Sequence, residues 1–366
     1  MLSRSLKTAK INVLRAMRYS ALDRRVLNSK WRQRRLAVLC FHGVSTADEH
    51  ECFPNFFITQ EILRQKLRLI QQLDMTVLRL SEAVERLKTG TLPKRSVVIT
   101  IDDGFYGAYA KGAPVIAEFG YPATIYQTTH YVNYNRPVFD NMCSYLLWKG
   151  IGSELRWDGV LDSPVRLDSS TRFSTMEKIA QHALTRRLTS VQKDELLAEL
   201  AAKLGIDYDA LCRKRMFHLV NPDEIRSWDN VEFELHTHRH RVARNKALFT
   251  EQLVRNAREL QRITGRESRH FAYPGGAYLP EFPAWLRELG LKSATTCVSG
   301  MATAGSDPFL LPRIMDTSGL SIEELGGWLS GAAALLPVRS YPLDTSQLLQ
   351  EEHVEPYVGP ASNGVQ

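Results

Sequence analysis

Short strand-like runs alternate with helix-like patterns along most of this chain, and this alternation limits the fold more than any other feature of the sequence. Residues 36–41, 96–101 and 231–235 are rich in apolar and β-branched side chains, as buried strands are. Amphipathic patterns between such runs predict helices over 59–72 and 250–263. Strands that alternate with helices predict a parallel α/β architecture, and their number suits a barrel. Further strands are expected at 123–126, 270–274, 293–296 and 310–312, and further helices at 81–88, 110–119 and 283–289.

The alternation is interrupted at about residues 134–226. This stretch contains a long charged helical pattern in two pieces, and we expect an insertion that covers a site on the barrel. The barrel itself would occupy 36–335. The last residues, 336–366, are rich in Pro, Gly and Ser and predict a flexible C-terminal tail.

The net charge of +7 belongs to one end of the chain. Residues 1–35 hold eleven basic residues and a single acidic one, Asp23, a net of +10, so the remainder carries −3. Aromatic side chains in this segment are sparse, and nucleic acid is not an expected partner.

The basic segment 1–35 has the pattern of an amphipathic helix. One arc of the helix carries Leu6, Ala9, Val13, Met17 and Ala21, and another carries Arg4, Lys7, Arg15, Arg18 and Arg25. Such a helix suits peripheral contact with an anionic membrane. The alternative is a solvated helix that packs on the domain or is partly disordered. No stretch is apolar enough for a signal peptide or a membrane span.

The five cysteines are scattered and never spaced as C-x-x-C, which excludes a disulfide framework and a zinc knuckle. We therefore expect a reducing, cytoplasmic setting, with peripheral contact at the inner membrane surface as an open alternative.

Two motifs 130 residues apart predict a metal site. Asp102 and Asp103 end the strand at 96–101 and precede Gly104, while His236 and His240 follow the strand at 231–235. The four-residue spacing would place both imidazoles on one side of a helical turn. Each motif alone has a structural alternative: an Asp-Gly turn with a helix cap, or a surface cluster of His and Arg. Together they supply three ligands and a spare carboxylate, which a metal-dependent hydrolase requires.

Three further positions are candidates. His42 ends the first strand, and its alternative role is that of a core histidine. The turn after Tyr273, with Gly275, offers backbone N–H groups to an oxyanion, or is an ordinary strand-to-helix turn. Arg313 is either a carboxylate clamp or a surface arginine.

The order of these motifs resembles that of the polysaccharide deacetylases, the NodB-homology group or carbohydrate esterase family 4. The resemblance covers about 36–320 and rests on Phe41-His42, Thr100–Gly104, His236–His240, Phe271–Gly276 and Leu311–Arg313. It implies a distorted (β/α)7-type barrel, a divalent metal (zinc in most members) and hydrolysis of the N-acetyl group of an amino sugar.

Matching positions assign roles by the same resemblance. Asp103, His236 and His240 correspond to metal ligands and Asp102 to the general base. The family's third motif often carries an arginine that orients the base; Ala272 stands there, and Arg313 is the candidate replacement. Gly275 would supply the oxyanion N–H. His42 fits the circularly permuted branch, in which the general acid lies on the first strand.

The sequence thus predicts a metal-dependent deacetylase, a hydrolase of carbon–nitrogen bonds other than peptide bonds. Its partner would be an N-acetylated carbohydrate: a polysaccharide, an oligosaccharide, or a lipid-linked or nucleotide-linked precursor. Two alternatives stay open: hydrolysis of a non-sugar amide on the same fold, and a carbohydrate-binding pseudoenzyme.

Overall fold

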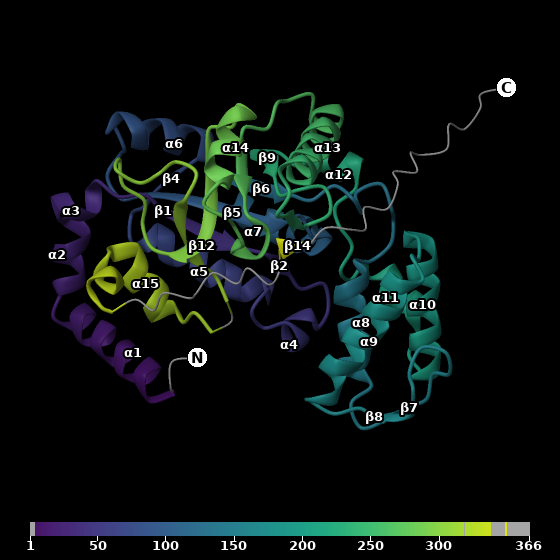
Figure 1. Ribbon diagram of the computed structural model, residues 1–366. Coiled ribbons are helices and arrows are strands. Elements are labelled where there is room, and N and C mark those ends of the chain that lie inside the picture. Colours follow the sequence, from purple (N-terminus) through teal and green to yellow (C-terminus); the bar gives the residue numbers. More distant parts are fainter. Residues whose placement is uncertain (1–3, 318, 338–347, 350–366) are drawn as a thin grey trace.

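The computed structural model describes residues 4–317, 319–337 and 348–349 and contains one main sheet of parallel strands (Figure 1). Its order is β1-β13-β12-β11-β9-β6-β5-β4, and a further pairing of β1 with β5 closes it. The strands are β1 (Ala37–Phe41), β4 (Thr76–Leu78), β5 (Ser96–Asp103), β6 (Ala123–Gln127), β9 (Val231–Leu235), β11 (His270–Ala272), β12 (Ser293–Ser299) and β13 (Leu311–Met315).

Closure leaves seven strands in the ring, and β4 lies outside it. β1 pairs along one edge of β5, with Ala37 opposite Val97. The other edge is shared, because β4 pairs with the start of β5 and β6 with its end. The predicted (β/α)7-type barrel is confirmed.

Side chains alternate between the inside and the outside of the ring. Val38, Val98, Tyr126, Ala272 and Leu311 come from five different strands and form one cluster, so they fill the barrel. The residues between them, such as Ile99 on β5, belong to the larger cluster shared with the helices. This two-residue period is the pleat of a strand, and it brings Asp102 inside with Val98.

Helices surround the ring. They are α5 (Gln60–Gln72), α6 (Leu80–Thr89), α7 (Ala113–Glu118), α13 (Lys246–Thr264), α14 (Phe282–Glu288) and α15 (Ile322–Ser330). The helix predicted over 59–72 is α5, and Thr59 caps it, since the Thr59 hydroxyl accepts a hydrogen bond from the Ile62 N–H. The expected start of α6 at Ser81 is wrong by one residue: its hydroxyl bonds to Glu232 instead of capping the helix.

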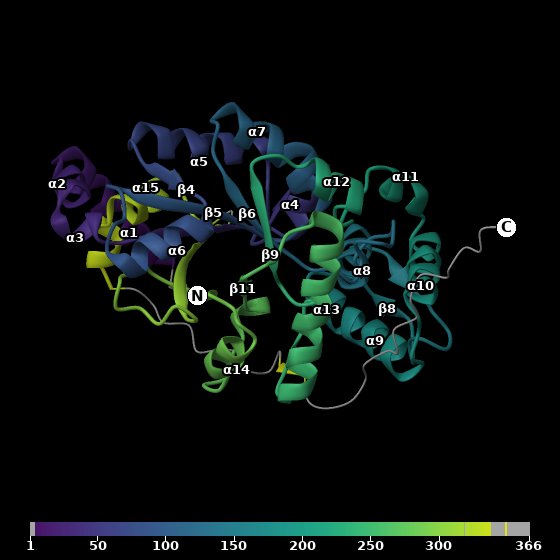
Figure 2. The same cartoon turned by 90° about the horizontal axis from the view of Figure 1, so that it is seen from above.

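The predicted insertion forms a helical group on one side of the barrel (Figures 1 and 2). It comprises α8 (Phe139–Lys149), β7 (Glu154–Leu155), β8 (Val165–Arg166), α9 (Thr171–Thr185), α10 (Ser190–Lys203), α11 (Tyr208–Arg213) and α12 (Pro222–Ser227). Its last part binds the loop after β5: the Tyr106 N–H donates to the His218 carbonyl (2.8 Å) and the Val220 N–H to the Gly104 carbonyl (3.0 Å). The insertion therefore borders the loop that follows Asp103.

Several short elements complete the described chain. They are α4 (Glu49–Cys52), the pair β2 (Gly43–Val44) and β3 (Phe57–Ile58), the pair β10 (Val242–Ala243) and β14 (Leu348–Leu349), a π-helical turn (Ala108–Gly112) and 3-10 turns at Pro274–Gly276 and Ala332–Leu335. The predicted tail, 336–366, lies outside the described residues except for 336–337 and 348–349.

The N-terminal segment folds as α1 (Arg4–Tyr19), α2 (Leu22–Asn28) and α3 (Lys30–Gln33), and α1 and α2 pack against α15. Leu14 and Leu27 are buried in this contact. Arg32 is buried completely and donates to the carbonyls of Leu329 (2.7 Å), Arg35 (2.8 Å) and Ser96 (3.4 Å). Burial, together with nearby Arg35, lowers the pKa of Arg32 to about 10. Among the described helices, none has the length and apolarity needed to cross a bilayer.

Replacing Arg32 by methionine should destabilise the fold, because three carbonyls would lose a buried donor. We expect the free energy of unfolding to fall by about 2–4 kcal/mol. The matched control is Arg34→Met in the same segment, whose exposed side chain should change it by less than about 0.5 kcal/mol. Urea unfolding followed by circular dichroism measures both, and equal losses in the two variants would contradict the anchoring role of Arg32.

Candidate metal centre

Asp103 and His236 reach one end of the barrel because each lies at the carboxyl end of a strand. Asp103 is the last residue of β5, and His236 follows β9 directly, with β6 between these strands. Asp103 has a φ of 69°, and Gly104 a φ of 80°. This left-handed backbone ends the alternation of β5, so that neighbouring carboxylates both lie at the barrel mouth.

The segment that carries His236 and His240 is a loop, so the predicted helical turn is wrong. Thr237 and His240 have φ values of 61° and 55°, which no α-helix contains. The loop is held from inside, because the Thr237 hydroxyl accepts a hydrogen bond from the Arg241 N–H (3.0 Å). It is also held by α13, since the Gln252 side chain accepts from the Arg239 N–H (3.1 Å).

This loop nevertheless brings both imidazoles to Asp103. The Nε2 atoms of His236 and His240 lie 3.3 Å and 3.1 Å from the same Oδ1 atom of Asp103. One ligand atom from each residue falls within 4.8 Å of the others. The structure thus gathers the three predicted ligands at one point.

Hydrogen bonds fix the orientation of His236. Its Nδ1 lies 2.8 Å from the carbonyl of Ala272, which can only accept, so Nδ1 carries a proton and Nε2 is the ring atom turned toward Asp103. The His236 N–H donates to Asn256 Oδ1 (2.9 Å), and Asn256 donates in turn to the Gln127 carbonyl (2.9 Å). A hydrogen-bond network that joins three strands and α13 therefore fixes the orientation of the His236 imidazole.

These three residues fit a divalent cation. Asp103 Oδ1 is buried and has no hydrogen-bond donor among the described residues, although two imidazole nitrogens face it. Burial opposes the charged form of Asp103, but His240 and His236 outweigh it and hold its pKa well below the usual range. The His240 side chain is 48% exposed, which leaves the site open to solvent on that side. One carboxylate and two imidazoles with an open side suit zinc and several other divalent ions.

Asp102 lies beside this cluster and is held by Arg313. Arg313 Nη1 donates to Asp102 Oδ1 (2.7 Å), and its Nε donates to the Thr296 carbonyl (2.9 Å). Both side chains are almost completely buried. Burial raises the pKa of Asp102, but Arg313, His236 and His42 outweigh it and bring that pKa below its ordinary value. Asp102 is therefore ionised at neutral pH, and Arg313 is a clamp inside the barrel, not a surface residue.

His42 lies next to Asp102 at the end of β1. One ring nitrogen of His42, Cys40 Sγ and an Asp102 carboxylate oxygen lie within 4.8 Å of one another. His42 Nδ1 is buried and has no hydrogen-bond partner among the described residues. Burial lowers the pKa of His42, although Asp102 and Asp103 act in the opposite direction.

Tyr273 was a candidate, together with Gly275, for contact with the oxyanion and the substrate, but the structure places its side chain outside the site. Its side chain packs with Phe271 and Phe282 between the barrel and α14, and its hydroxyl donates to the Phe309 carbonyl (3.1 Å). Its N–H donates to the Thr295 carbonyl (3.2 Å). Both donors of Tyr273 are thus occupied elsewhere.

The glycine turn after Tyr273 does lie near the Asp102–Arg313 pair. Gly275 and Gly276 have φ values of 61° and 72°. A Cβ on Gly276 would lie 2.7 Å from the Cβ of Cys297, whose sulfur is 4.0 Å from Arg313 Nη2. This close approach requires glycine, and the role of the Gly275 N–H as an oxyanion donor stays a prediction.

Comparisons with known proteins agree with the motif resemblance. A family model described as polysaccharide deacetylase matches residues 173–294, a stretch that includes His236, His240 and the 271–276 turn. The matched residues make up about a third of the chain, and the match agrees with the resemblance to the polysaccharide deacetylases. A search of curated proteins finds no match.

Solved structures show the same fold. IcaB from Ammonifex degensii has a TM-score of 0.51 at 18% identity, over 81% of this chain and 97% of that one. The deacetylase PplD from Streptococcus pyogenes, in complex with acetate, gives 0.51 at 16% identity, over 81% and 98%. A de-N-acetylase from Aggregatibacter actinomycetemcomitans gives 0.50 at 15% identity, over 80% and 99%.

Three residues of this site had not been predicted from the sequence. Asn256 supports His236 from the middle of α13, and Cys297 contacts Arg313. Phe56 is 50% exposed, and its ring centroid lies 5.2 Å from that of His42. A buried polar position on the inner face of α13 was a usable signal for Asn256; the pattern around Phe56 contains none.

Zinc binding should depend on His240 and not on His238, although the two are close in sequence. His238 is buried and its Nδ1 lies 2.9 Å from the Thr129 hydroxyl, away from Asp103. We expect His240→Gln to weaken zinc binding at least about tenfold, and His238→Gln to leave it within about twofold. Isothermal titration calorimetry of metal-stripped protein measures both, and equal affinities would remove His240 from the ligand set.

Proposed function

We propose that this chain is a member of the polysaccharide deacetylase family and a metal-dependent deacetylase that removes the N-acetyl group from an amino sugar. The observation that carries the proposal is the meeting of Asp103, His236 and His240 beside a second carboxylate, Asp102, which Arg313 holds. A binding protein has no use for an ionised, buried carboxylate next to three ligands. A hydrolase uses such a group as a general base.

A divalent cation held by Asp103, His236 and His240 would supply Lewis acidity toward the acetamide carbonyl and the attacking water. Asp102 accepts the proton of that water as the new carbon–oxygen bond forms. Arg313 keeps Asp102 ionised before the reaction and fixes the position of one of its oxygens. This leaves the carboxylate ready to accept a proton in a single orientation.

The carbon–nitrogen bond then breaks, and the amine must take up a proton. His42 lies within reach of Asp102, so the proton that Asp102 accepted returns through His42 to the departing nitrogen. Because burial lowers the pKa of His42, this histidine is neutral at rest and gives up a proton readily once it gains one. The products are acetate and a free amino sugar.

The surroundings of the site support a sugar as the substrate. Phe56 offers an exposed apolar ring beside His42, a surface on which the C–H face of a sugar ring can rest. Of two aromatic residues in the insertion, Trp157 is buried and donates to Glu199, whereas Tyr134 is exposed. The proposed substrate is a polysaccharide, an oligosaccharide, or a lipid-linked or nucleotide-linked precursor. A cytoplasmic location is part of the proposal and rests on the cysteine pattern.

Asp102→Asn should abolish most of the activity without removing the metal. Loss of the base is expected to lower kcat by about 10²–10⁴-fold while zinc binding persists. Acetate release from N-acetylglucosamine oligomers and from lipid-linked and nucleotide-linked N-acetylglucosamine is measured for metal-stripped and zinc-restored protein. No release from any sugar by the zinc-loaded wild type would favour a non-sugar amide or a pseudoenzyme.

Phe56→Ala should weaken substrate binding more than it slows the chemistry. Loss of the ring is expected to raise KM about three- to tenfold with kcat nearly unchanged. The matched control is Phe173→Ala, which removes an equally exposed ring from α9 in the insertion and should leave KM unchanged. A fall in kcat with an unchanged KM would contradict a platform role and assign Phe56 to the support of His42.

A further inference from the structure

The N-terminal helices have an inner face, which packs against the body of the protein, and an outer face, which is exposed. On the inner face, Leu14 packs against Gly327 of α15, and Lys10 lies over the ring of Trp328 (5.5 Å). Lys7 donates to the Gly319 carbonyl (2.5 Å), and Arg15 pairs with Glu323 (2.9 Å). The helix is therefore fixed to the body, and its remaining surface is presented to the surroundings in one orientation.

The outer face is apolar in its centre. Ala9, Val13 and Ala16 are exposed at i, i+4 and i+7 of α1, on the side opposite to Leu14. Tyr19 at the end of α1 is 91% exposed, and Leu22 at the start of α2 is 42% exposed. These side chains form a stripe that nothing in the described part of the chain covers.

Basic side chains flank this stripe. Arg18, Arg24, Arg25, Lys30 and Arg34 are exposed, and no described residue forms an ion pair with any of them. Asp23 is the one acidic residue in 1–35, whereas residues 36–366 carry a net charge of −3. The net positive charge thus belongs to the segment of α1–α3, and these helices lie together at one end of the molecule (Figure 1).

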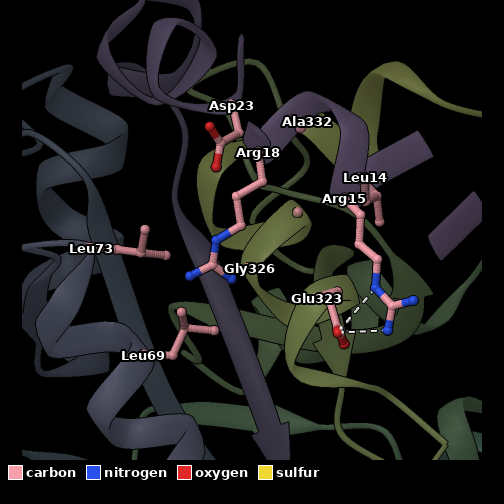
Figure 3. Close-up of a pocket in the computed structure, with 10 residues that line it drawn as sticks. Leu14, Arg15, Arg18, Asp23, Leu69, Leu73, Glu323, Gly326 and Ala332 are labelled. Carbon is pink, nitrogen blue, oxygen red and sulfur yellow. Dashed lines mark hydrogen bonds and ion pairs between the residues drawn. The ribbon is translucent and has the colours of Figure 1, made fainter. Parts of the chain in front are cut away.

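Arg18 also reaches into a crevice between α1, α5 and α15. Figure 3 shows its guanidinium beside Leu73 and Gly326, with Leu69 below. Apolar residues form most of the lining: Leu14, Leu69, Leu73, Gly326, Gly327 and Ala332. Arg15, Asp23 and Glu323 complete the lining.

We propose that the outer face of α1 and α2 docks on an anionic lipid bilayer. The stripe Val13–Tyr19–Leu22 would enter the interface between headgroups and acyl chains, and the flanking arginines would bind lipid phosphates. Charge selects this occupant over a second copy of the same face, because two faces that each carry five exposed basic side chains repel each other. The exposed apolar side chains select it over nucleic acid, whose phosphates have no use for them.

The contacts also define how the barrel lies on the membrane. Lys7 binds Gly319, just beyond the carboxyl end of β13, whereas Arg32 binds Ser96, the first residue of β5. The N-terminal segment therefore runs along the barrel from the carboxyl ends of its strands to their amino ends. Docking would lay the barrel on its side, with the Asp102–Asp103 end opening along the bilayer surface. This docking does not require that the proposed reaction be correct.

Co-sedimentation of the full-length protein with vesicles tests the proposal. We expect binding to phosphatidylcholine–phosphatidylglycerol vesicles, weakening with added salt, and none to phosphatidylcholine alone. The variant Arg18→Gln/Arg24→Gln/Arg25→Gln/Lys30→Gln should bind about fivefold less per lost charge, or about several hundred-fold in total. The variant Val13→Ser/Tyr19→Ser/Leu22→Ser keeps every charge and should bind at least about tenfold less.

The matched control removes four exposed arginines from the insertion: Arg156→Gln/Arg166→Gln/Arg186→Gln/Arg187→Gln. It should bind vesicles like the wild type. An equal loss in this control would mean that net charge alone drives binding, and no binding of the wild type to anionic vesicles would also overturn the proposal. So would tight binding to an RNA oligomer that the charge variant loses and the apolar variant keeps. Unchanged melting temperatures establish that each variant is folded.

Discussion

The buried pair of Asp102 and Arg313 is the interaction on which the site depends. Transfer of two opposite charges into a barrel is expensive, and their attraction repays it only if every remaining donor and acceptor is satisfied. Arg313 meets this condition through Asp102, the Thr296 carbonyl and the sulfur of Cys297, with the Tyr126 ring 5.8 Å away. A pair of apolar residues would fill the same space more cheaply. We infer that the pair is retained because it keeps a carboxylate ionised where water meets the metal ligands.

The backbone is strained at two of the predicted metal ligands and at a residue between the two histidines. Asp103, Thr237 and His240 have left-handed φ values, each of which costs a non-glycine residue about 1 kcal/mol or more. The bonds of Thr237 to Arg241, of Gln252 to Arg239 and of Asn256 to His236 offset this strain. The loop is thus held from three sides, and the geometry that brings His240 to Asp103 is built before any ion arrives.

The sequence was a good guide where one periodicity governs a segment. Strand positions and the amphipathic face of α5 follow from local pattern. Asp103 and His236 were predicted to meet because each stands at the carboxyl end of a parallel strand, although they lie far apart in the chain. The sequence failed as a guide where the backbone leaves regular structure, because the spacing of His236 and His240 does not distinguish a helical turn from a loop with two left-handed residues. The place of Tyr273 was within reach: Phe271 and Tyr273 have the same parity along the chain and pack outside the barrel, whereas Ala272 between them faces its interior. The division of α1 into an inner and an outer face depends on α15, about 300 residues away, and no local pattern contains it.

The position of β1 between β5 and β13 has a consequence for how the protein is made. The strand that carries Asp102 meets β1 early, but the ring closes only when β13 arrives, and Arg313 comes with it, 211 residues after Asp102. At the usual pace of translation this separation amounts to about 10–40 s. During that interval the nascent chain holds two neighbouring carboxylates without their counter-charge, in a sheet with two open edges. The reactive centre is therefore assembled late in synthesis, and a chain truncated before β13 would have an open sheet and an Asp102 without its Arg313.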